Sequence, residues 1–204
     1  FRRPPRLSLA IRGVGGQGNL FFGKVLAQVA FLAGYDDRNI LKGETHGMAQ
    51  MGGPVISTFG CGEVFSPALV PGTANVLIAM EKAEALRPGF LDLLEPGGTV
   101  LMADTRILPH GLKPEAYPSD EAIAAQLEGY RVVTVDVLNI ALSLGDHKGR
   151  CANVAMLGVL STLPPFDVVP EAVWLQALKG ISRKPALWDL NHAAFMAGRG
   201  MQKG

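Results

Sequence analysis

The sequence predicts an α/β fold: a three-layer sandwich with a mainly parallel, Rossmann-like sheet and extra helices at its C-terminal end. Short apolar runs alternate with segments of helical periodicity through most of the 204 residues, as in parallel α/β sheets. A glycine-rich turn separates the first apolar run from the first helical segment. The last third of the chain is a series of predicted helices, which would complete the domain after the last strand.

The first strand and helix flank the glycine-rich turn. Leu7 to Ile11 predicts a strand, and Gly18 to Ala33 predicts a helix because its apolar residues recur at intervals of three and four. Gly34 is expected to end that helix, since glycine is common just after a helix C-terminus. Residues 1–6 are expected to be an N-terminal tail or linker, and residues 7–204 a single domain.

The next segment predicts two strands on either side of a polar loop. Arg38 to Lys42 predicts a short strand, and Val55 to Phe59 alternates as strands do. The polar, glycine-rich residues Gly43 to Gly53 lie between them. A hairpin-like break is expected at residues 60–62, with Val64–Phe65 pairing back antiparallel. If the first two strands are neighbours, the polar loop lies beside the glycine-rich turn.

The remaining elements alternate before the final helices. Asn75 to Met80 has the continuous apolar character of a buried central strand. Glu81 to Leu94 predicts helical structure, which Pro88 divides into two short helices. The remaining expected strands are Thr99–Ala103 and Arg131–Val135. The remaining expected helices are Asp120–Glu128, capped by Ser119, and Val137–Leu144, Asn153–Leu163, Glu171–Lys179 and Leu187–Gly200.

Composition and charge argue against several classes of function. The formal net charge of +1 gives no reason to expect nucleic acid. No segment has the roughly 18 apolar residues of a membrane-spanning helix, and the N-terminal residues do not have a signal-peptide pattern. The two cysteines, Cys61 and Cys151, are far apart, which suits free thiols in the cytoplasm. Two cysteines cannot by themselves hold an iron–sulfur cluster or a cysteine-rich zinc site.

The glycine-rich turn is the first candidate site. Gly13, Gly15 and Gly18 have G-x-G-x-x-G spacing, which permits a tight turn, close approach of a phosphate, and packing of helix on strand. The N-terminus of the following helix would favour the anion. In NAD-binding folds an acidic residue at the end of the second strand holds the ribose, but Asp36 and Asp37 precede that strand here. The turn therefore predicts either a phosphate site or a purely structural turn, and does not favour NAD.

The polar loop is the second candidate site. Glu44 and His46 alternate along an extended chain, and Gln50 follows in the same loop. Loops at the carboxyl end of an open α/β sheet are where ligands bind, so this segment forms either a pocket wall or a plain surface loop. No metal site is predicted, because the other three histidines are scattered along the sequence.

The two segments together resemble one family. The sequence G-V-G-G-Q-G-N at residues 13–19, followed by E-T-H-G-M-A-Q-M-G-G-P-V at residues 44–55, is similar to the gamma-type domain of the 2-oxoacid:ferredoxin oxidoreductases. Within that family it most resembles the small subunit of the indolepyruvate enzymes. The likeness covers nearly the whole chain from Leu7 and includes residues 74–79 and 153–158.

The resemblance implies a subunit of a larger enzyme that decarboxylates a 2-oxoacid oxidatively, forms an acyl-CoA and passes electrons to ferredoxin. In the family, thiamine diphosphate and [4Fe-4S] clusters belong to partner subunits or domains, and the gamma-type domain contributes to the coenzyme A site. Glu44 and His46 are the implied catalytic residues, and with Gln50 they would face the thiamine-bearing partner. The implied cofactor-binding residues are Gly13, Gly15, Gly16, Gln17, Gly18, Asn19 and Gln50.

The resemblance leaves the substrate open. An aryl 2-oxoacid such as indolepyruvate is favoured, with pyruvate, 2-oxoglutarate and branched-chain oxoacids as alternatives. The chain has Met51 where the family pattern leads us to expect arginine, which removes a charge beside the implied pocket. Two other functions remain as alternatives: a free-standing nucleotide-binding dehydrogenase, and a non-catalytic interaction module with an empty glycine turn.

Overall fold

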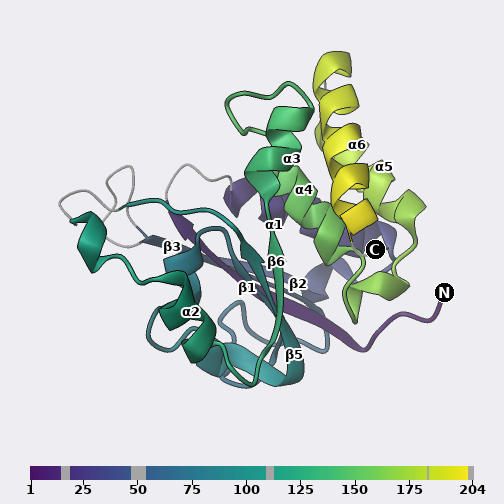
Figure 1. The fold of residues 1–204 in the computed structure, drawn as a ribbon. Helices are drawn as coiled ribbons and strands as arrows, with labels where there is room; N and C mark the ends of the chain where they lie inside the picture. The colour runs from purple at the N-terminus through teal and green to yellow at the C-terminus, as the bar shows by residue number, and fades with distance from the viewer. Residues whose placement is uncertain (15–18, 47–53, 109–112, 183, 202–204) are drawn as a thin grey trace.

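The computed structural model describes residues 1–14, 19–46, 54–108, 113–182 and 184–201 (Figure 1). These residues form a six-stranded sheet with helices on both faces. The α/β class and the mainly parallel sheet predicted from the sequence are confirmed. None of the helices in this part of the chain is long and apolar enough to cross a membrane.

The sheet has the strand order β2-β3-β1-β4-β5-β6. β1, β4, β5 and β6 pair in parallel, whereas β3 is antiparallel to both of its neighbours. It follows that β2 runs in the same direction as the parallel strands and that β3 runs against them. The strands are β1 (Arg6–Val14), β2 (Ile40–His46), β3 (Pro54–Gly62), β4 (Ala74–Ala79), β5 (Leu94–Ala103) and β6 (Arg131–Val135).

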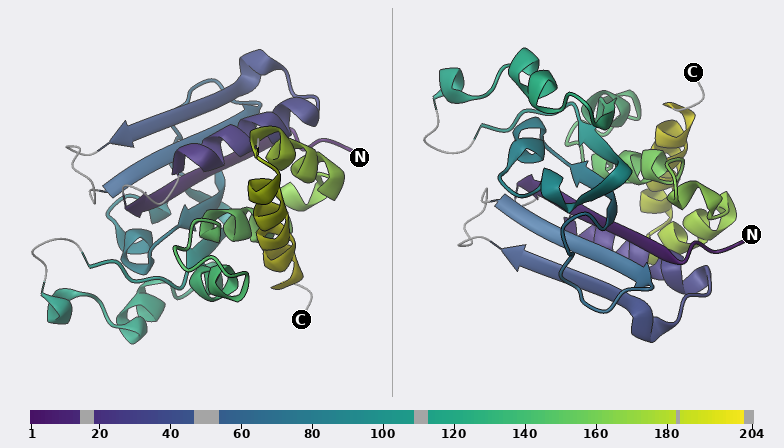
Figure 2. Two further views of the ribbon diagram at one scale, coloured as in Figure 1. Left: turned by 90° about the horizontal axis from the view of Figure 1, so that it is seen from above. Right: turned by 90° about the horizontal axis from the view of Figure 1, so that it is seen from below.

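The first two strands are not neighbours, because β3 lies between them, so the condition under which the sequence placed the polar loop beside the glycine-rich turn is not met. β3 pairs with β1 from Arg6↔Gly62 to Val14↔Pro54, and with β2 from Ile40↔Cys61 to His46↔Val55. An antiparallel hairpin keeps the consecutive strands β2 and β3 together, and its second strand then covers the edge of β1. The carboxyl ends of β1 and β2 still lie at the same edge of the sheet (Figure 2).

The expected break at residues 60–62 and the strand at Val64–Phe65 are also wrong. Cys61 is fully buried within β3, so the strand continues to Gly62, where a φ of +85° ends it. Val64 instead forms a tight turn, in which its N–H donates to the Gly62 carbonyl at 2.8 Å. Its side chain covers Gly60, where an added Cβ would lie 3.0 Å from the valine Cγ1.

Five α-helices cover one face of the sheet and form the main core (Figures 1 and 2). Alternate strand residues such as Leu9, Ile11 and Ile78 point into this layer and are almost fully buried. Trp174 packs there against Phe166 and Phe195, with ring centroids 6.5 and 6.2 Å away. The helices are α1 (Asn19–Leu32), α3 (Val137–Ser143), α4 (Ala152–Leu160), α5 (Glu171–Ile181) and α6 (Pro185–Gly200).

The other face carries a thinner layer made of α2 (Asp120–Gln126) and short 3-10 helices. Ser119 caps α2 as expected, since its hydroxyl accepts from the Ala122 N–H at 3.2 Å. The helical segment predicted over Glu81–Leu94 consists of two 3-10 helices, η2 (Lys82–Leu86) and η3 (Leu91–Leu93), and Leu94 already begins β5. Pro88, which lacks an N–H, and Gly89, at a φ of +79°, separate the two short helices.

Helices α4 and α6 cross at two glycines. A Cβ on Gly158 would collide with the Phe195 carbonyl, and one on Gly198 would collide with the Ala155 carbonyl. The two helix backbones therefore approach closely only because both positions lack a side chain. This contact fixes the C-terminal helix against the buried helix α4, which the core surrounds.

We expect Gly198→Ala to destabilise the protein by about 1–3 kcal/mol, because the added methyl overpacks the α4–α6 crossing. Thermal unfolding should show a lower Tm. Gly180→Ala is the matched control: Gly180 is exposed on α5 with nothing within 4 Å of an added Cβ. It should raise stability by about 0.5–1 kcal/mol through helix propensity. Equal Tm changes in the two variants would contradict the close crossing.

Candidate functional site

The carboxyl edge of the sheet brings the candidate segments together. β1 and β2 end at this edge, and the first residue of α1, Asn19, follows the glycine-rich turn. Gly13 is buried in β1, where it pairs with Val55. The other candidate cofactor-binding residues, Gly15, Gly16, Gln17, Gly18 and Gln50, lie outside the described residues, as does Met51.

His46 is the last described residue of β2, and Glu44 lies two residues before it. In the ladder, His46 pairs with Val55, which in turn pairs with Gly13. Two strand spacings of about 4.8 Å put His46 about 10 Å from the start of the glycine turn. Thus the structure brings the two predicted segments to one edge, although β3 separates their strands.

Glu44 lies on the face of β2 that packs against α1. Ile40, on the same side by strand alternation, packs on the α-helical core. Lys42, two residues before Glu44, passes Gly23 of α1, where an added Cβ would lie 3.6 Å from the lysine Cδ. Because the chain proceeds from there toward the carboxyl edge, Glu44 is placed toward the N-terminus of α1. The Glu44 residue is exposed.

A buried ion-pair network, which the sequence did not reveal, borders the glycine-rich turn. Arg12, at the end of β1, pairs through Nε with Glu84 Oε2 at 3.1 Å, and its guanidinium lies 5.8 Å from the Phe90 ring centroid. Glu84 is only 2% exposed and also pairs with Arg87 at 2.9 Å. The Arg12 carbonyl accepts from the Met80 N–H at 2.8 Å. These contacts fix the backbone from which the turn begins.

A second buried carboxylate, Glu81, connects the end of β4 to the segment before α2. It accepts hydrogen bonds from the Tyr117 hydroxyl and from the N–H groups of Glu84 and Ile107, the latter two at 3.2 and 3.4 Å. Burial and the contact with Glu81 raise the pKa of Tyr117. Arg106 lies over the tyrosine ring, 5.3 Å from its centroid. Glu81 therefore has a structural role at the edge.

The acidic residues expected near an NAD ribose lie at the opposite edge. Asp36 precedes η1 (Asp37–Asn39) at the start of β2, where its carboxylate pairs with Arg38 at 2.7 Å. The hydrogen bond from the Arg38 side chain lowers the pKa of Asp36 to about 2. The sequence placed these residues before the second strand, and the structure shows the same, so the geometry does not favour a ribose contact.

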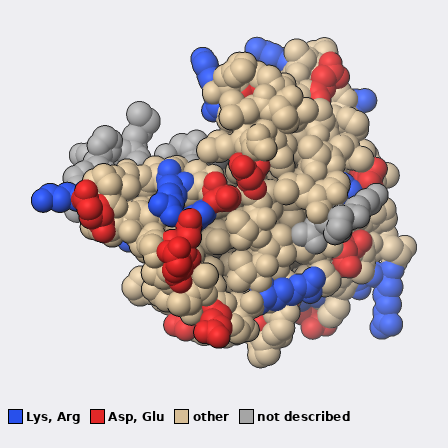
Figure 3. Space-filling model, viewed as in Figure 1, with Lys and Arg blue, Asp and Glu red and all other residues tan. Residues whose placement is uncertain are grey.

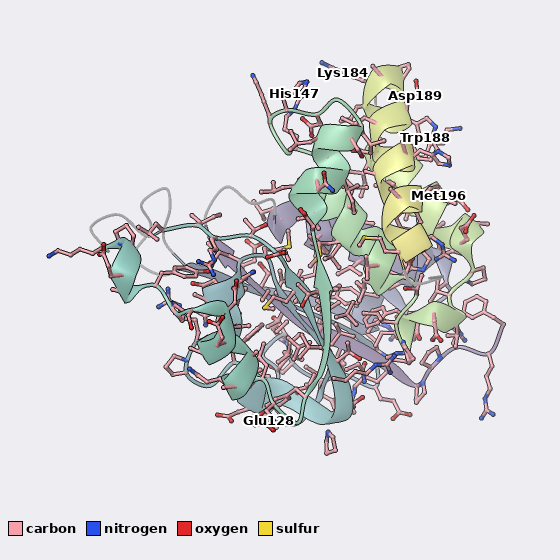
Figure 4. All side chains as sticks on the ribbon, viewed as in Figure 1. Glu128, His147, Lys184, Trp188, Asp189 and Met196 are labelled. Carbon is pink, nitrogen blue, oxygen red and sulfur yellow. The ribbon has the colours of Figure 1, made fainter. Side chains whose placement is uncertain are left out.

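The described residues contain no group of three or more His, Cys, Asp and Glu side chains that could hold a metal ion. Both cysteines are buried, and burial raises the pKa of Cys61 to about 12 and that of Cys151 to about 11. His192 packs against Trp188 of α6 in a tilted arrangement, with ring centroids 5.2 Å apart, whereas His147 lies in the loop after α3 (Figure 4). Positive and negative side chains are interspersed on the face in Figure 3, which shows no continuous basic surface.

Comparison with known proteins identifies relatives of the whole chain. A family model described as pyruvate ferredoxin/flavodoxin oxidoreductase matches residues 8–201. Indolepyruvate oxidoreductase subunit IorB of Archaeoglobus fulgidus is 35% identical over 201 residues, covering 95% of this chain and 94% of that protein. The subunit of the same name from Thermococcus kodakarensis is 33% identical over 197 residues, covering 94% of this chain and 93% of that protein.

Solved structures share the fold. Pyruvate oxidoreductase subunit PORC from Thermotoga maritima superimposes with a TM-score of 0.70 at 20% identity, covering 96% of each chain. A 2-oxoglutarate:ferredoxin oxidoreductase from Magnetococcus marinus, with 2-oxoglutarate, coenzyme A and succinyl-CoA bound, gives a TM-score of 0.71 at 19% identity. That match covers 98% of this chain and 32% of the other, so this fold is part of a longer chain there.

These matches confirm the family predicted from the glycine-rich turn and the polar loop. They leave the roles of the individual site residues as predictions. A family model that spans residues 8–201, together with relatives 33–35% identical over nearly their full length, shows that the chain belongs to the pyruvate ferredoxin/flavodoxin oxidoreductase family.

Proposed function

We propose that this chain is the small subunit of a thiamine diphosphate-dependent oxidoreductase that converts an aryl 2-oxoacid such as indolepyruvate to an acyl-CoA and reduces ferredoxin. The observation that carries the proposal is the identity of 33–35% with IorB subunits over more than nine-tenths of both chains. Because those relatives are named as subunits, the proposal includes partner subunits or domains of the same enzyme and a location in the cytoplasm.

Coenzyme A fits the chemistry of the carboxyl edge. The cofactor carries a diphosphate and a 3′-phosphate, and a glycine turn at a helix N-terminus offers N–H donors to such groups. α1 begins with Asn19 directly after the turn, and β1 fixes the other side. The proposed contacts are the backbone and side chains of Gly13, Gly15, Gly16, Gln17, Gly18 and Asn19. When bound, coenzyme A supplies the thiol that accepts the acyl group.

Thiamine diphosphate and [4Fe-4S] clusters are proposed to lie in partner subunits. The sequence has two cysteines, whereas such a cluster is held by about four thiolates. Both thiols are also buried, Cys61 in β3 and Cys151 before α4. The thiamine supplies the carbanion chemistry, and this chain would supply position and electrostatics.

Glu44, His46 and Gln50 are proposed to face the thiamine-bearing partner. Glu44 is exposed at the carboxyl edge beside α1, so it can reach a neighbouring subunit. A carboxylate there could orient the cofactor or move a proton, the two roles that carboxylates commonly have in acyl transfer. Gln50, four residues after His46 in the sequence, lies outside the described residues.

The assembled enzyme tests the proposal. Native mass spectrometry of the chain purified from its own source should show a hetero-oligomer, and the same sample should contain thiamine diphosphate and iron. Coenzyme A-dependent reduction of ferredoxin should have a kcat/KM for indolepyruvate at least about tenfold above that for pyruvate or 2-oxoglutarate. A lone particle with neither cofactor would reject the subunit assignment, and a preference for pyruvate would reject only the aryl substrate.

Gly15→Val tests the coenzyme A site in the assembled enzyme. The added side chain should block approach of a phosphate to the turn and raise KM for coenzyme A by about tenfold or more, a loss of about 1.4 kcal/mol. Gly180→Val, at an exposed position with free space, is the control and should leave KM unchanged. An unaltered KM in the Gly15 variant would remove the phosphate site from the turn.

Glu44→Gln tests the role of the polar hairpin. If the carboxylate transfers a proton, kcat should fall about 100-fold while KM for coenzyme A stays the same. Because Glu44 is exposed, the variant should fold normally. Lys42→Gln removes a charge two residues earlier on the same face of β2 and should retain kcat. Equal activities of the two variants would assign Glu44 to packing against the partner.

A further inference from the structure

We propose that the Ser57 hydroxyl in β3 positions the carboxylate of Glu44, by donating a hydrogen bond to it when the partner subunit covers this edge of the sheet. The inference rests on the proposed function, in which Glu44 faces the thiamine-bearing partner. Ser57 is a positioning residue in this role, since it acts through Glu44 and touches neither substrate nor cofactor. No sequence motif singles out this serine, and the strand ladder places it beside Glu44.

Ser57 lies at the centre of three paired strands. It pairs with Glu44 of β2 on one side and with Ile11 of β1 on the other. Directly paired residues point to the same face of a sheet, with Cβ atoms about 4.5–5.5 Å apart. Ile11 packs into the α-helical core, so Ser57 and Glu44 also face the layer that contains α1. The two side chains are therefore neighbours on one face, within reach of a hydrogen bond.

The two side chains differ in exposure. Ser57 is only 5% exposed because α1 packs over β3 (Figure 2), whereas Glu44 is exposed. β2 is the last strand on this side of the sheet that the described residues form. The serine therefore belongs to the core and the glutamate to the surface, and a partner subunit that covers Glu44 would bury both groups together.

The Ser57 hydroxyl oxygen is buried and has no hydrogen-bond partner in the part of the chain that the structure describes. A buried hydroxyl without a partner destabilises a fold, and alanine at the same position would avoid this penalty. The neighbours on the same face, Ile11 and Phe59, are apolar and at most 2% exposed, so an apolar residue would suit the position. A polar group that is kept here at the expense of stability indicates a function at the adjacent site.

The next residue along β3, Thr58, provides a contrast. Thr58 points to the opposite face of the strand, where its hydroxyl donates to the Pro67 carbonyl at 2.6 Å. This hydrogen bond ties the segment after β3 to the sheet, which is a structural role. Of these two adjacent hydroxyl groups, the one that faces Glu44 is the one without a partner.

The pair suits a carboxylate that orients a cofactor or moves a proton. A carboxylate can accept about four hydrogen bonds, so Ser57 can donate to Glu44 in addition to the contacts that Glu44 already makes. Hydrogen bonds to catalytic groups are often incomplete in a free protein and tighten in the ligand-bound complex. When a partner excludes water from Glu44, the buried Ser57 hydroxyl would hold the carboxylate in one orientation.

A double-mutant cycle in the assembled enzyme tests the proposal, with the variants Ser57→Ala, Glu44→Gln and the combination of both. Ser57→Ala should lower kcat about tenfold, as for the loss of one hydrogen bond to a charged group. KM for coenzyme A and for the 2-oxoacid should stay the same. Because the serine acts through the carboxylate, the double variant should be as slow as Glu44→Gln and no slower.

Thermal unfolding of the full chain separates this role from packing. Ser57→Ala removes a buried hydroxyl without a partner, so its Tm should be unchanged or higher. Thr58→Val is the matched control, since it removes a hydroxyl that has a partner from the adjacent residue. It should lower the Tm by about 2–4 °C and retain kcat. The two variants are therefore expected to affect stability and activity in opposite ways.

Three results would overturn the proposal and leave the proposed function in place. They are an unchanged kcat in Ser57→Ala, a Tm that falls together with kcat in that variant, and a double variant about tenfold slower than Glu44→Gln. The last result would mean that Ser57 acts independently of Glu44. Failure of the proposed function is distinguishable, because Glu44→Gln itself would then keep its full kcat.

Discussion

The carboxyl edge of the sheet depends on β1, which is hydrogen-bonded on both sides. β3 pairs along the full length of β1, and β4 pairs in parallel from Leu9 to Arg12. Leu9 and Ile11 bury their side chains under the helices, and Ala10 faces the other layer. Because β1 is hydrogen-bonded to a strand on each side and buried on both faces, its register is fixed. The residues that lead into the glycine-rich turn therefore have a defined position. Pre-positioned backbone of this kind makes a site precise.

Two buried carboxylates complete that edge. Glu81 and Glu84 are each 2% exposed, and an ionised carboxylate without partners would be costly at such a depth. Arg12 and Arg87 compensate Glu84, while the Tyr117 hydroxyl and backbone N–H groups satisfy Glu81. Removal of one member would leave a buried charge unpaired, which is more harmful than replacing the whole network. These acids therefore hold β1, β4 and the segment before α2 together.

Local signals in the sequence predicted the local structure. Ser119 caps α2, Gly34 ends α1 with a φ of +84°, and Pro88 separates two short helices, because each effect acts within a few residues. Strand order could not be predicted in this way: placing β3 between β1 and β2 depends on contacts across more than 40 residues. The pairing of Arg12 with Glu84 is likewise set by the fold and not by any local pattern.

In the candidate site, too, local sequence signals predicted individual residues but not the contacts that depend on the fold. Glu44 and His46 were identified from the polar loop in the sequence, and the ladder places both at the expected carboxyl edge although β3 separates β2 from β1. A cavity at the carboxyl ends of β4, β5 and β6, lined by Arg106, Lys148 and Arg150, has no sequence signal, because its residues converge only after three strands have paired and α4 has docked. Loops that follow successive parallel strands meet at one edge of the sheet, so residues far apart in the sequence come together there only once the strands have paired.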